Sequence, residues 1–287
     1  MNILNWHSTC NQVLPGICNI FTHASACTTS GAKSERYNDP MIDVHCHLLP
    51  MVDDGAKSWE MALEMCQVAR ADGISHIVCT PHANDQYPYD RTKHQQTLNE
   101  LRSKTQSGLE LTLGCDFHFS YDNIQAAIAS ADDYLIGNTD YLLVELSDYA
   151  IPPQIKDIFF RLLTAGLVPI ITHPERNRIL QRTPAPVLDW VQAGCLVQVT
   201  ASAVTAFWGE QAQAVALWLI KNGAAHVLAT DAHDAVHRPP VLSAARDLIA
   251  RQFGAELAQA LVLDNPSAIV NGKPLVTRSG ELERKAQ

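Results

Sequence analysis

The stretch "MIDVHCHLLPMVDDG", residues 41–55, begins as an apolar strand and ends in a turn rich in carboxylates. Two interpretations compete for its centre. His45 and His47 could be two ligands of one cation, because residues two apart on a strand project to the same face. Cys46 could instead be the nucleophile of a cysteine phosphatase loop, whose motif places an arginine six positions after the cysteine. That position holds Val52, and none of the eight cysteines has an arginine at this spacing, so the histidines are favoured.

The composition is that of a globular protein, with 47% hydrophobic and 18% charged residues in 287. This length suits one large domain or two small ones. The formal net charge of −9, without any basic run, disfavours a nucleic-acid partner. Eight irregularly spaced cysteines predict free thiols in the cytoplasm rather than a disulfide framework. No apolar run approaches the roughly 20 residues that a membrane span needs.

Residues 1–40 differ in character from the rest of the chain. They are rich in Ser, Thr, Asn and Cys, and their first lysine is Lys33, which does not match the positive start of a secretory signal. We expect either a disordered extension or an over-long start with Met41 as the true first residue. Residues 41–287 are then expected to form a single domain.

From residue 41 onward, short apolar runs of strand length alternate with helix-like segments. The seven expected strands are Met41–His47, His76–His82, Leu109–Phe119, Tyr141–Ser147, Val168–His173, Leu196–Thr200 and His226–Asp231. Helices are expected at roughly 58–72, 90–104, 123–129, 153–165, 184–193, 209–222 and 240–253, with a last one near 256–263 that stops at Asn265-Pro266. Such nearly continuous apolar runs are typical of a parallel sheet buried on both faces. The alternation predicts an α/β fold with right-handed crossovers, either a seven-stranded barrel or an open doubly wound sheet.

Imidazole and carboxylate groups gather at the ends of six of the seven expected strands. They are His45, His47, His82, Asp116, His118, Glu145, His173, Asp231 and, just beyond, His233. In parallel barrels the chemistry lies at the carboxyl ends of the strands, so this distribution favours the barrel. A single histidine is more often structural, but a buried set of this kind without cations would be costly to desolvate. Nitrogen and oxygen ligands without thiolate suit Mn²⁺, Fe²⁺ or Zn²⁺, and their number suits two or three ions.

Two arginines follow these strand ends closely. Arg176 lies in "THPERNR" just after His173, and Arg238 lies in "DAHDAVHRPP" just after His233. Arginine binds phosphate through two parallel hydrogen bonds, so beside a multimetal site we expect phosphate contacts rather than surface ion pairs. Of the adjacent pair Asp53 and Asp54, one is expected to be a metal ligand and the other to support it or to cap the turn.

Taken in order, five motifs resemble the polymerase and histidinol phosphatase superfamily, and within it the manganese-dependent protein-tyrosine phosphatases of the bacterial capsule and exopolysaccharide type. They are "MIDVHCHLLPMVDDG", "ISHIVCTPH", "LVELSDY", "PIITHPERN" and "LATDAHD" with "RPP", and they cover residues 41 to about 266. The resemblance implies a distorted seven-stranded (β/α) barrel that holds three divalent ions.

The resemblance also implies which residues bind which ion. The first ion would take His45, His47, Asp116 and Asp231; the second Asp116, Glu145 and His173; and the third Asp54, His82 and His233. Arg176 and Arg238 match residues that bind the substrate phosphate. One departure stands out: the family usually has glutamate where this chain has Asp116. His118 faces the same side and could compensate for the shorter side chain.

The function expected from the resemblance is hydrolysis of phosphotyrosine on a protein, with a bacterial tyrosine autokinase of polysaccharide export as the substrate. Hydroxide produced at the ions would attack phosphorus in line, and the third ion or His233 would assist the leaving phenoxide. Two alternatives stay open at this point: a small-molecule phosphatase of the histidinol phosphate kind, and a regulatory binding protein with a non-catalytic metal site. The sequence does not indicate the oligomeric state.

Overall fold

The computed structural model describes residues 40–105 and 108–275, which lie in one compact unit. The expectation for residues 1–39 and for the chain after residue 275 lies outside this part. Within it, no helix is both long and apolar enough to cross a membrane.

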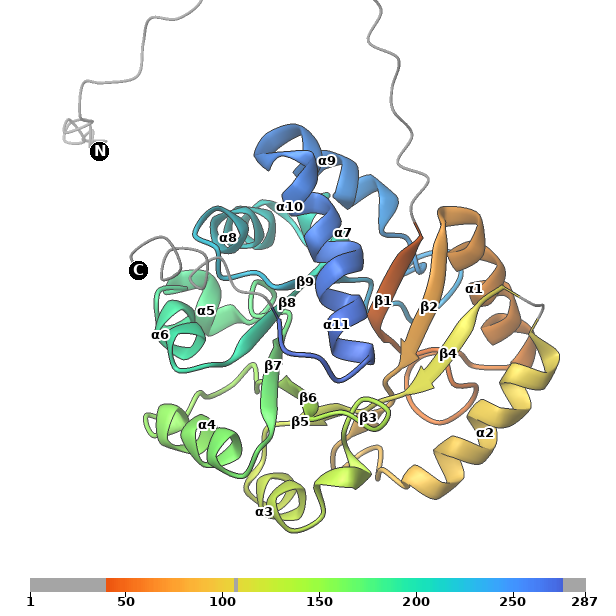
Figure 1. Cartoon of the computed structure of the whole chain (residues 1–287), viewed down its shortest axis with the longest axis horizontal. Helices are drawn as coiled ribbons and strands as arrows, with labels where there is room; N and C mark the ends of the chain where they lie inside the picture. The colour runs from red at the N-terminus through yellow and green to blue at the C-terminus, as the bar shows by residue number, and fades with distance from the viewer. Residues whose placement is uncertain (1–39, 106–107, 276–287) are drawn as a thin grey trace, which may run out of the picture. The chain divides into compact units, whose positions relative to one another are not determined.

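Parallel strands form the centre of the described unit, in two sheets (Figure 1). The first sheet has the order β1-β2-β4 and the second the order β3-β5-β6-β7-β8-β9. All pairings are parallel, as the alternation of strands and helices predicts. The strands are β1 (Met41–Cys46), β2 (Ile74–Cys79), β3 (His82–Ala83), β4 (Glu110–Leu113), β5 (Asp116–His118), β6 (Tyr141–Glu145), β7 (Val168–Thr172), β8 (Leu196–Thr200) and β9 (Val227–Ala229).

Two expected strands are interrupted, which is why the described residues hold nine strands and not seven. The run 76–82 divides into β2 and β3 around Pro81, which has no N–H to donate to a neighbouring strand. The run 109–119 divides into β4 and β5 around Gly114, where a Cβ would lie 2.9 Å from Val78 Cγ1. Hydrogen bonds from Gly114 N to Cys79 O (2.8 Å) and from Asp116 N to Pro81 O (3.0 Å) continue the contact through the interruption.

Backbone hydrogen bonds also join the end of the first strand to the segment that follows the last strand. Asp231 N donates to His45 O (2.8 Å) and His47 N donates to Ala232 O (2.9 Å), around an isolated parallel bridge between Cys46 and Ala232. The end of β1 and the segment after β9 are therefore held side by side, although about 190 residues separate them in the chain.

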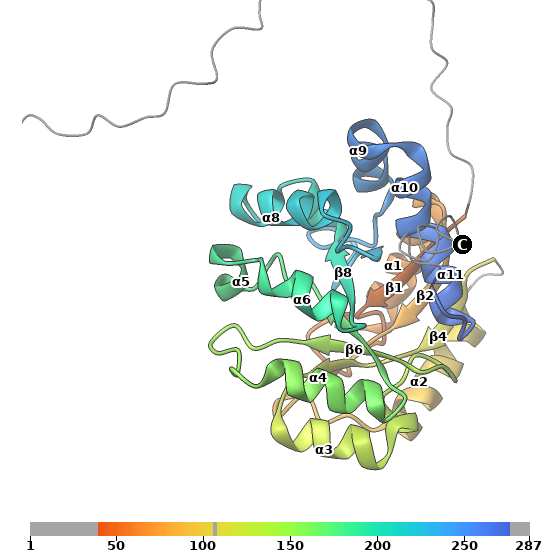
Figure 2. The ribbon, with the colours of Figure 1, turned by 60° about the vertical axis from the view of Figure 1, so that its left-hand side comes forward.

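Helices lie outside the strands, as Figures 1 and 2 show for α3, α4 and α6 beside β6–β8. The first expected helix is confirmed together with its ends, because Ser58 accepts a hydrogen bond from Met61 N and Gly73 takes a left-handed φ of 94°. The helices are α1 (Trp59–Asp72), α2 (Arg91–Lys104), α3 (Tyr121–Ala129), α4 (Ile155–Thr164), α5 (Arg178–Arg182), α6 (Pro186–Gln192), α7 (Ala201–Val204), α8 (Glu210–Lys221), α9 (Ser243–Phe253), α10 (Ala255–Gln259) and α11 (Asn265–Val270), with the 3₁₀ turn η1 (Ala131–Asp133) and the π-helical turn η2 (Ala260–Asp264).

The expected stop of the last helix at Asn265-Pro266 is wrong. The chain continues from α10 through η2 into α11, and Pro266 lies in the first turn of α11. The expectation fails because the backbone stays in the right-handed helical region at Ala260, Asp264 and Asn265, so the chain does not leave the helical path before Pro266. Ile269 of α11 belongs to the same buried apolar cluster as Val44 and other side chains of the face that the strands share.

This shared face changes from apolar to polar along each strand. On β6, Tyr141 and Leu143 belong to the apolar cluster, and Glu145 follows two residues later on the same face. On β1, Val44 belongs to the same cluster, and a register shift before Cys46 inserts one extra residue. His45 in β1 and His47 directly after it, together called the histidines of β1, therefore follow on the polar part of the face. The polar groups therefore collect beyond the carboxyl ends of the strands.

Candidate metal centre

The nine predicted metal ligands lie together at the carboxyl ends of the strands. Their ligand atoms form four overlapping groups, in each of which all atoms lie within 4.8 Å of one another. The groups are His45, His47 and Asp116; His45, His173 and Asp231; His82, Asp116 and Glu145; and His47, Asp54, His82 and His233. Shared members such as Asp116 make the groups one continuous centre.

His45, at the end of β1, and His47, directly after it, lie close to two carboxylates, Asp116 of the first group and Asp231 of the second. The Nε2 atoms of His45 and His47 lie 3.2 Å apart, and each lies 3.3–3.4 Å from Asp231 Oδ1. Asp116 is fully buried, and neither of its carboxylate oxygens has a hydrogen-bond partner. Buried carboxylate oxygens are normally paired, so this arrangement fits a cation between the rings and the carboxylates.

Three of the histidines are oriented from behind by an acceptor. His45 Nδ1 donates to Gln198 Oε1 (3.1 Å) and His233 Nδ1 donates to Asp231 O (3.0 Å), because a carbonyl oxygen can only accept. His47 Nδ1 lies 2.7 Å from Asp53 Oδ2. Each Nε2 lone pair is thereby directed into the centre, which is the orientation that ligating histidines usually have.

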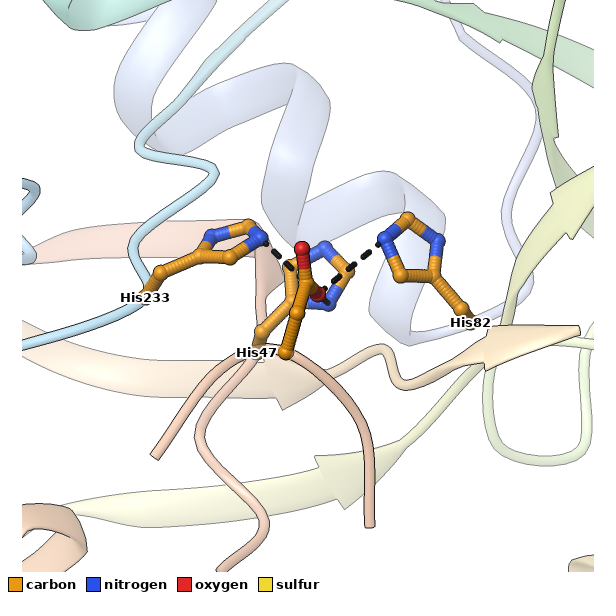
Figure 3. A group of neighbouring side chains, drawn as sticks. His47, His82 and His233 are labelled. Carbon is orange, nitrogen blue, oxygen red and sulfur yellow. Dashed lines mark ion pairs between the residues drawn. The ribbon is translucent and has the colours of Figure 1, made fainter. Parts of the chain in front are cut away.

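Asp54 lies between two imidazoles, with its Oδ1 atom 3.3 Å from Nε2 of both His82 and His233. Figure 3 shows these two rings pointing at the carboxylate from opposite sides, with His47 beside them. Since the Nε2 atom of His233 carries a lone pair, it faces Asp54 as one acceptor faces another. A cation between them would resolve this contact.

The remaining two ligands and His118 lie on the side of β5–β7. His82 Nδ1 is 3.0 Å from Asp116 Oδ2 and 3.7 Å from Glu145 Oε2. His173 Nε2 is 3.8 Å from Glu145 Oε1. The structure thus groups His82 with Asp116 and Glu145, whereas the resemblance places His173 there. His118 Nδ1 lies 3.6 Å from Glu145 Oε2 and its side chain is one-third exposed.

The structure assigns different positions to the adjacent carboxylates of the "DDG" turn. Asp53 accepts three hydrogen bonds, from His47 Nδ1, from Gly55 N (2.9 Å) and from His82 N (3.1 Å). It therefore supports two histidines, while Asp54 points between imidazoles. Gly55 is required beside them, because a Cβ there would lie 2.1 Å from His47 O.

Both predicted arginines reach the centre through Asp231. Arg238 Nη2 donates to Asp231 Oδ2 (2.7 Å) and to Asp231 O (2.9 Å), and Arg176 Nη1 donates to the same Oδ2 atom. Asp231 Oδ1 faces the histidines of β1, so this carboxylate connects the arginines to the centre. A cavity of about 550 Å³ opens beside them, and Arg176, Glu145 and His173 line it.

Backbone strain also marks this centre. Among the described residues other than glycine, four have a positive φ, and two of them are His173 (32°) and Asp231 (50°). Such conformations are uncommon outside glycine and collect at functional sites, where surrounding contacts enforce them. Hydrogen bonds from His173 N to Gln198 O and from Asp231 N to His45 O hold the two backbones.

Charge and burial set the protonation of the centre without ions. Burial lowers the pKa of His45, and burial together with the charge of Arg176 holds the pKa of His173 well below its usual range. Burial alone would raise the pKa of Asp231, but Arg176 and His45 outweigh it and hold that pKa well below its usual range. Asp53 and Asp231 outweigh burial at His47 and raise its pKa to about 9, and Asp116 and Asp54 raise the pKa of His82 to about 11. Without ions, His45 and His173 are therefore neutral, whereas His47 and His82 hold protons that bound cations would displace.

Cys46 lies away from the imidazoles, in the apolar cluster between strands and helices, as strand alternation predicts. Burial raises the pKa of its thiol well above the usual range, which excludes a reactive thiolate.

Two residues beside the centre, Gln198 and Trp208, are not among those predicted from the sequence. Gln198 had a detectable signal, as the one polar residue within the apolar part of "LVQVT", but Trp208 lies in a loop without periodicity.

The fold and the centre define a class of protein: a parallel α/β fold with histidines and carboxylates converging at the strand ends, where hydrolytic metal centres are commonly built. The family follows from the sequence comparison. The model of the family described as "Capsular polysaccharide synthesis, CpsB/CapC" matches residues 41–271, and the chain belongs to this family. The capsule-type resemblance is thereby confirmed.

Relatives with assigned names support the same placement. The putative tyrosine-protein phosphatase CapC of Staphylococcus aureus is 32% identical, over 83% of this chain and 91% of its own length. The tyrosine-protein phosphatase YwqE of Bacillus subtilis is 30% identical, over 77% and 88%. A crystal structure from work on YwqE and on CpsB of Streptococcus pneumoniae, described as metal-dependent tyrosine phosphatases, superposes with a TM-score of 0.76 at 28% identity, over 83% of this chain and 97% of that one. A lactonase from Listeria monocytogenes, at 13% identity and a TM-score of 0.54, shares the fold alone.

Proposed function

We propose that this chain is a metal-dependent phosphatase that hydrolyses phosphotyrosine on a protein substrate. The observation that carries the proposal is the position of Asp231, which faces the histidines of β1 with one oxygen and binds Arg176 and Arg238 with the other. A phosphate dianion beside this carboxylate would meet both the cation site and two guanidinium groups. The phosphatase names of the relatives in the family point to the same reaction.

We assign the metal ligands as the resemblance implies, and Mn²⁺ as the metal, with Fe²⁺ or Zn²⁺ as substitutes. The first ion would be held by His45, His47, Asp116 and Asp231; the second by Asp116, Glu145 and His173; and the third by Asp54, His82 and His233. Asp116 is fully buried and its Oδ2 atom faces His82, His45 and His47, which supports a place where it would contact more than one ion. The close approach of His82 to Asp116 supports a third ion adjacent to them.

The ions, when bound, polarise the phosphoryl oxygens and lower the pKa of water for in-line attack on phosphorus. Arg176 and Arg238 bind the equatorial oxygens and stabilise the charge that develops on them. Asp53 and Gln198 hold the histidines of β1 in the ligand tautomer. His233 donates its Nδ1 proton to a backbone carbonyl, which directs its Nε2 atom at Asp54, where the two residues would hold an ion together.

Three further statements belong to the same proposal. The substrate is a bacterial tyrosine autokinase of polysaccharide export, because the chain belongs to a capsule-synthesis family. The reaction takes place in the cytoplasm, which suits five free buried cysteines among the described residues. The two sheets form one distorted seven-stranded barrel within a single domain that begins at residue 41. In this count β2 with β3 and β4 with β5 each make one strand, and the hydrogen bonds between the end of β1 and the segment after β9 close the barrel.

The test is a substrate comparison with the metal-free protein as its baseline. After chelation, the protein is reloaded with Mn²⁺ and assayed on a phosphotyrosine peptide, the matching phosphoserine peptide and histidinol phosphate. We expect turnover of the phosphotyrosine peptide to exceed that of the other two at least tenfold in kcat/KM. Faster hydrolysis of histidinol phosphate would indicate the small-molecule phosphatase instead, and turnover of none would indicate a regulatory binding protein.

A further inference from the structure

The indole of Trp208 lies against both arginines of the proposed phosphate site. Its ring centroid is 4.0 Å from the Cζ atom of Arg176 and 5.3 Å from the Cζ atom of Arg238. Both distances are within the range in which a guanidinium is attracted by the negative face of an aromatic ring. Trp208 also lines the cavity beside the candidate metal centre, so it contributes to the same wall as Arg176.

The chain fixes this indole with local contacts. Trp208 follows α7 in a turn where Ala206 has a φ of 67° and Gly209 a φ of 89°, and Gly209 N donates to Ala206 O (3.0 Å). The indole Nε1 donates to Ser202 Oγ (2.9 Å) within α7, which begins directly after β8. The ring orientation is therefore tied to the end of a strand and not left to a free loop.

The two guanidinium groups need such a partner. Both bind the same Oδ2 atom of Asp231, so two positive charges lie close together with one carboxylate between them and the metal ligands. A second carboxylate would relieve the repulsion, but it would occupy the N–H groups that a phosphate requires. An aromatic face attracts the cations without accepting these hydrogen bonds. Arg238 Nε is in fact buried without a hydrogen-bond partner, so no acceptor of the protein takes the place of the aromatic face at this atom.

We propose that Trp208 is a positioning residue, which holds the guanidinium group of Arg176 at the cavity wall and that of Arg238 beside it, with the donors that do not bind Asp231 left for a phosphate dianion. The identity of the ligand rests on the proposed function. The contribution of the indole is the orientation of the arginines, so it affects phosphate binding and leaves metal binding unchanged.

The experiment measures the affinity of the full-length, Mn²⁺-loaded protein for inorganic phosphate by calorimetry. Trp208→Leu removes the aromatic face and is expected to weaken phosphate binding about tenfold. Trp208→Phe keeps a face and is expected to stay within about threefold of the wild type, while Ser202→Ala is expected to give an intermediate loss. Trp59→Leu is the matched control, because Trp59 forms an indole–cation pair with Lys104 outside the cavity and its loss should change nothing.

Mn²⁺ affinity is measured on the same samples and should be equal in all variants. Phosphate affinity of Trp208→Leu equal to the wild type, or of Trp208→Phe as low as that of Trp208→Leu, would overturn the inference. If Trp208→Leu does not fold, Ser202→Ala decides: at least threefold weaker phosphate binding supports the inference, and unchanged binding overturns it. The proposed function can fail separately from this inference. If phosphate binding depends on Trp208 but the protein does not hydrolyse phosphotyrosine, the proposed function is wrong and the positioning role of Trp208 still holds.

Discussion

Asp53 gives the sharpest test of how the centre is built, because it is expected to support the metal ligands without being one. Its buried carboxylate accepts hydrogen bonds from His47 Nδ1 (2.7 Å), Gly55 N (2.9 Å) and His82 N (3.1 Å). Asp53→Asn preserves the shape and one acceptor oxygen but removes the negative charge opposite His47. The bond to His47 then becomes one between neutral groups or is lost.

The expected magnitudes follow from these contacts. A hydrogen bond to a charged group contributes about 1.5–3 kcal/mol to stability. Of the three bonds that Asp53 accepts, Asp53→Asn weakens the bond from His47 Nδ1 most. The free energy of unfolding of the metal-free protein should therefore fall by about 2–3 kcal/mol. Without the carboxylate, the tautomer and orientation of His47 are no longer fixed. Loss of such a supporting group typically lowers metal affinity by about 10–100-fold. At saturating Mn²⁺ the turnover number should return to within a few fold of the wild type.

The assay combines urea unfolding of the metal-free protein with an Mn²⁺ titration of phosphatase activity on a phosphotyrosine peptide. The adjacent Asp54→Asn is the matched control: this residue is a proposed ligand, so its activity should stay low at any Mn²⁺ concentration. The reasoning is refuted if Asp53→Asn binds Mn²⁺ as tightly as the wild type, or if its activity is not restored by excess Mn²⁺.

Other regions of the molecule give three further predictions. Mild alkylation of thiols should leave phosphatase activity intact because Cys46 is fully buried. Inactivation that mass spectrometry traces to the Cys46 thiol would contradict the assignment of the chemistry to metal-binding histidines. Burial lowers the pKa of His226 to about 4, so the unfolded chain binds a proton that the folded one does not, and stability should fall by up to about 3 kcal/mol as pH drops from 6.5 to 4. His226→Asn, which can still accept from Val197 N, should flatten this part of the urea-derived stability profile of the metal-free protein, and a profile parallel to the wild type would count against it. Deletion of residues 1–40 should leave the melting temperature and activity unchanged, and an unfolded product would show that the domain begins earlier.

The sequence predicts the ordering of elements well because the strands are apolar and the polar groups stand at their ends. Glu145 and Asp231 could be placed because they stand at the ends of expected strands, and the structure brings both into the centre. The split of the second and third predicted strands was not foreseen. It depends on Pro81, which lacks a donor, and on the close packing at Gly114, and neither effect is visible in a pattern of hydrophobicity.

Residues that support the centre from outside the strand ends were harder to recognise. Asp53 and Asp54 are equivalent in the sequence, and only the turn closed by Gly55 separates the ligand position from the supporting one. Trp208 contacts Arg176 across 32 positions of the chain, through a loop whose course depends on the left-handed φ of Ala206. Long-range contacts of this kind carry no local signal.

The central claim is that ions held by the histidines and carboxylates at the strand ends carry out phosphotyrosine hydrolysis. The most direct measurement is the metal content of the purified protein together with its activity on a phosphotyrosine peptide before chelation, after chelation and after addition of Mn²⁺. We predict two or three divalent ions per chain, loss of activity when they are removed and recovery when Mn²⁺ is restored. Full activity in a protein shown to be free of metal would contradict the account.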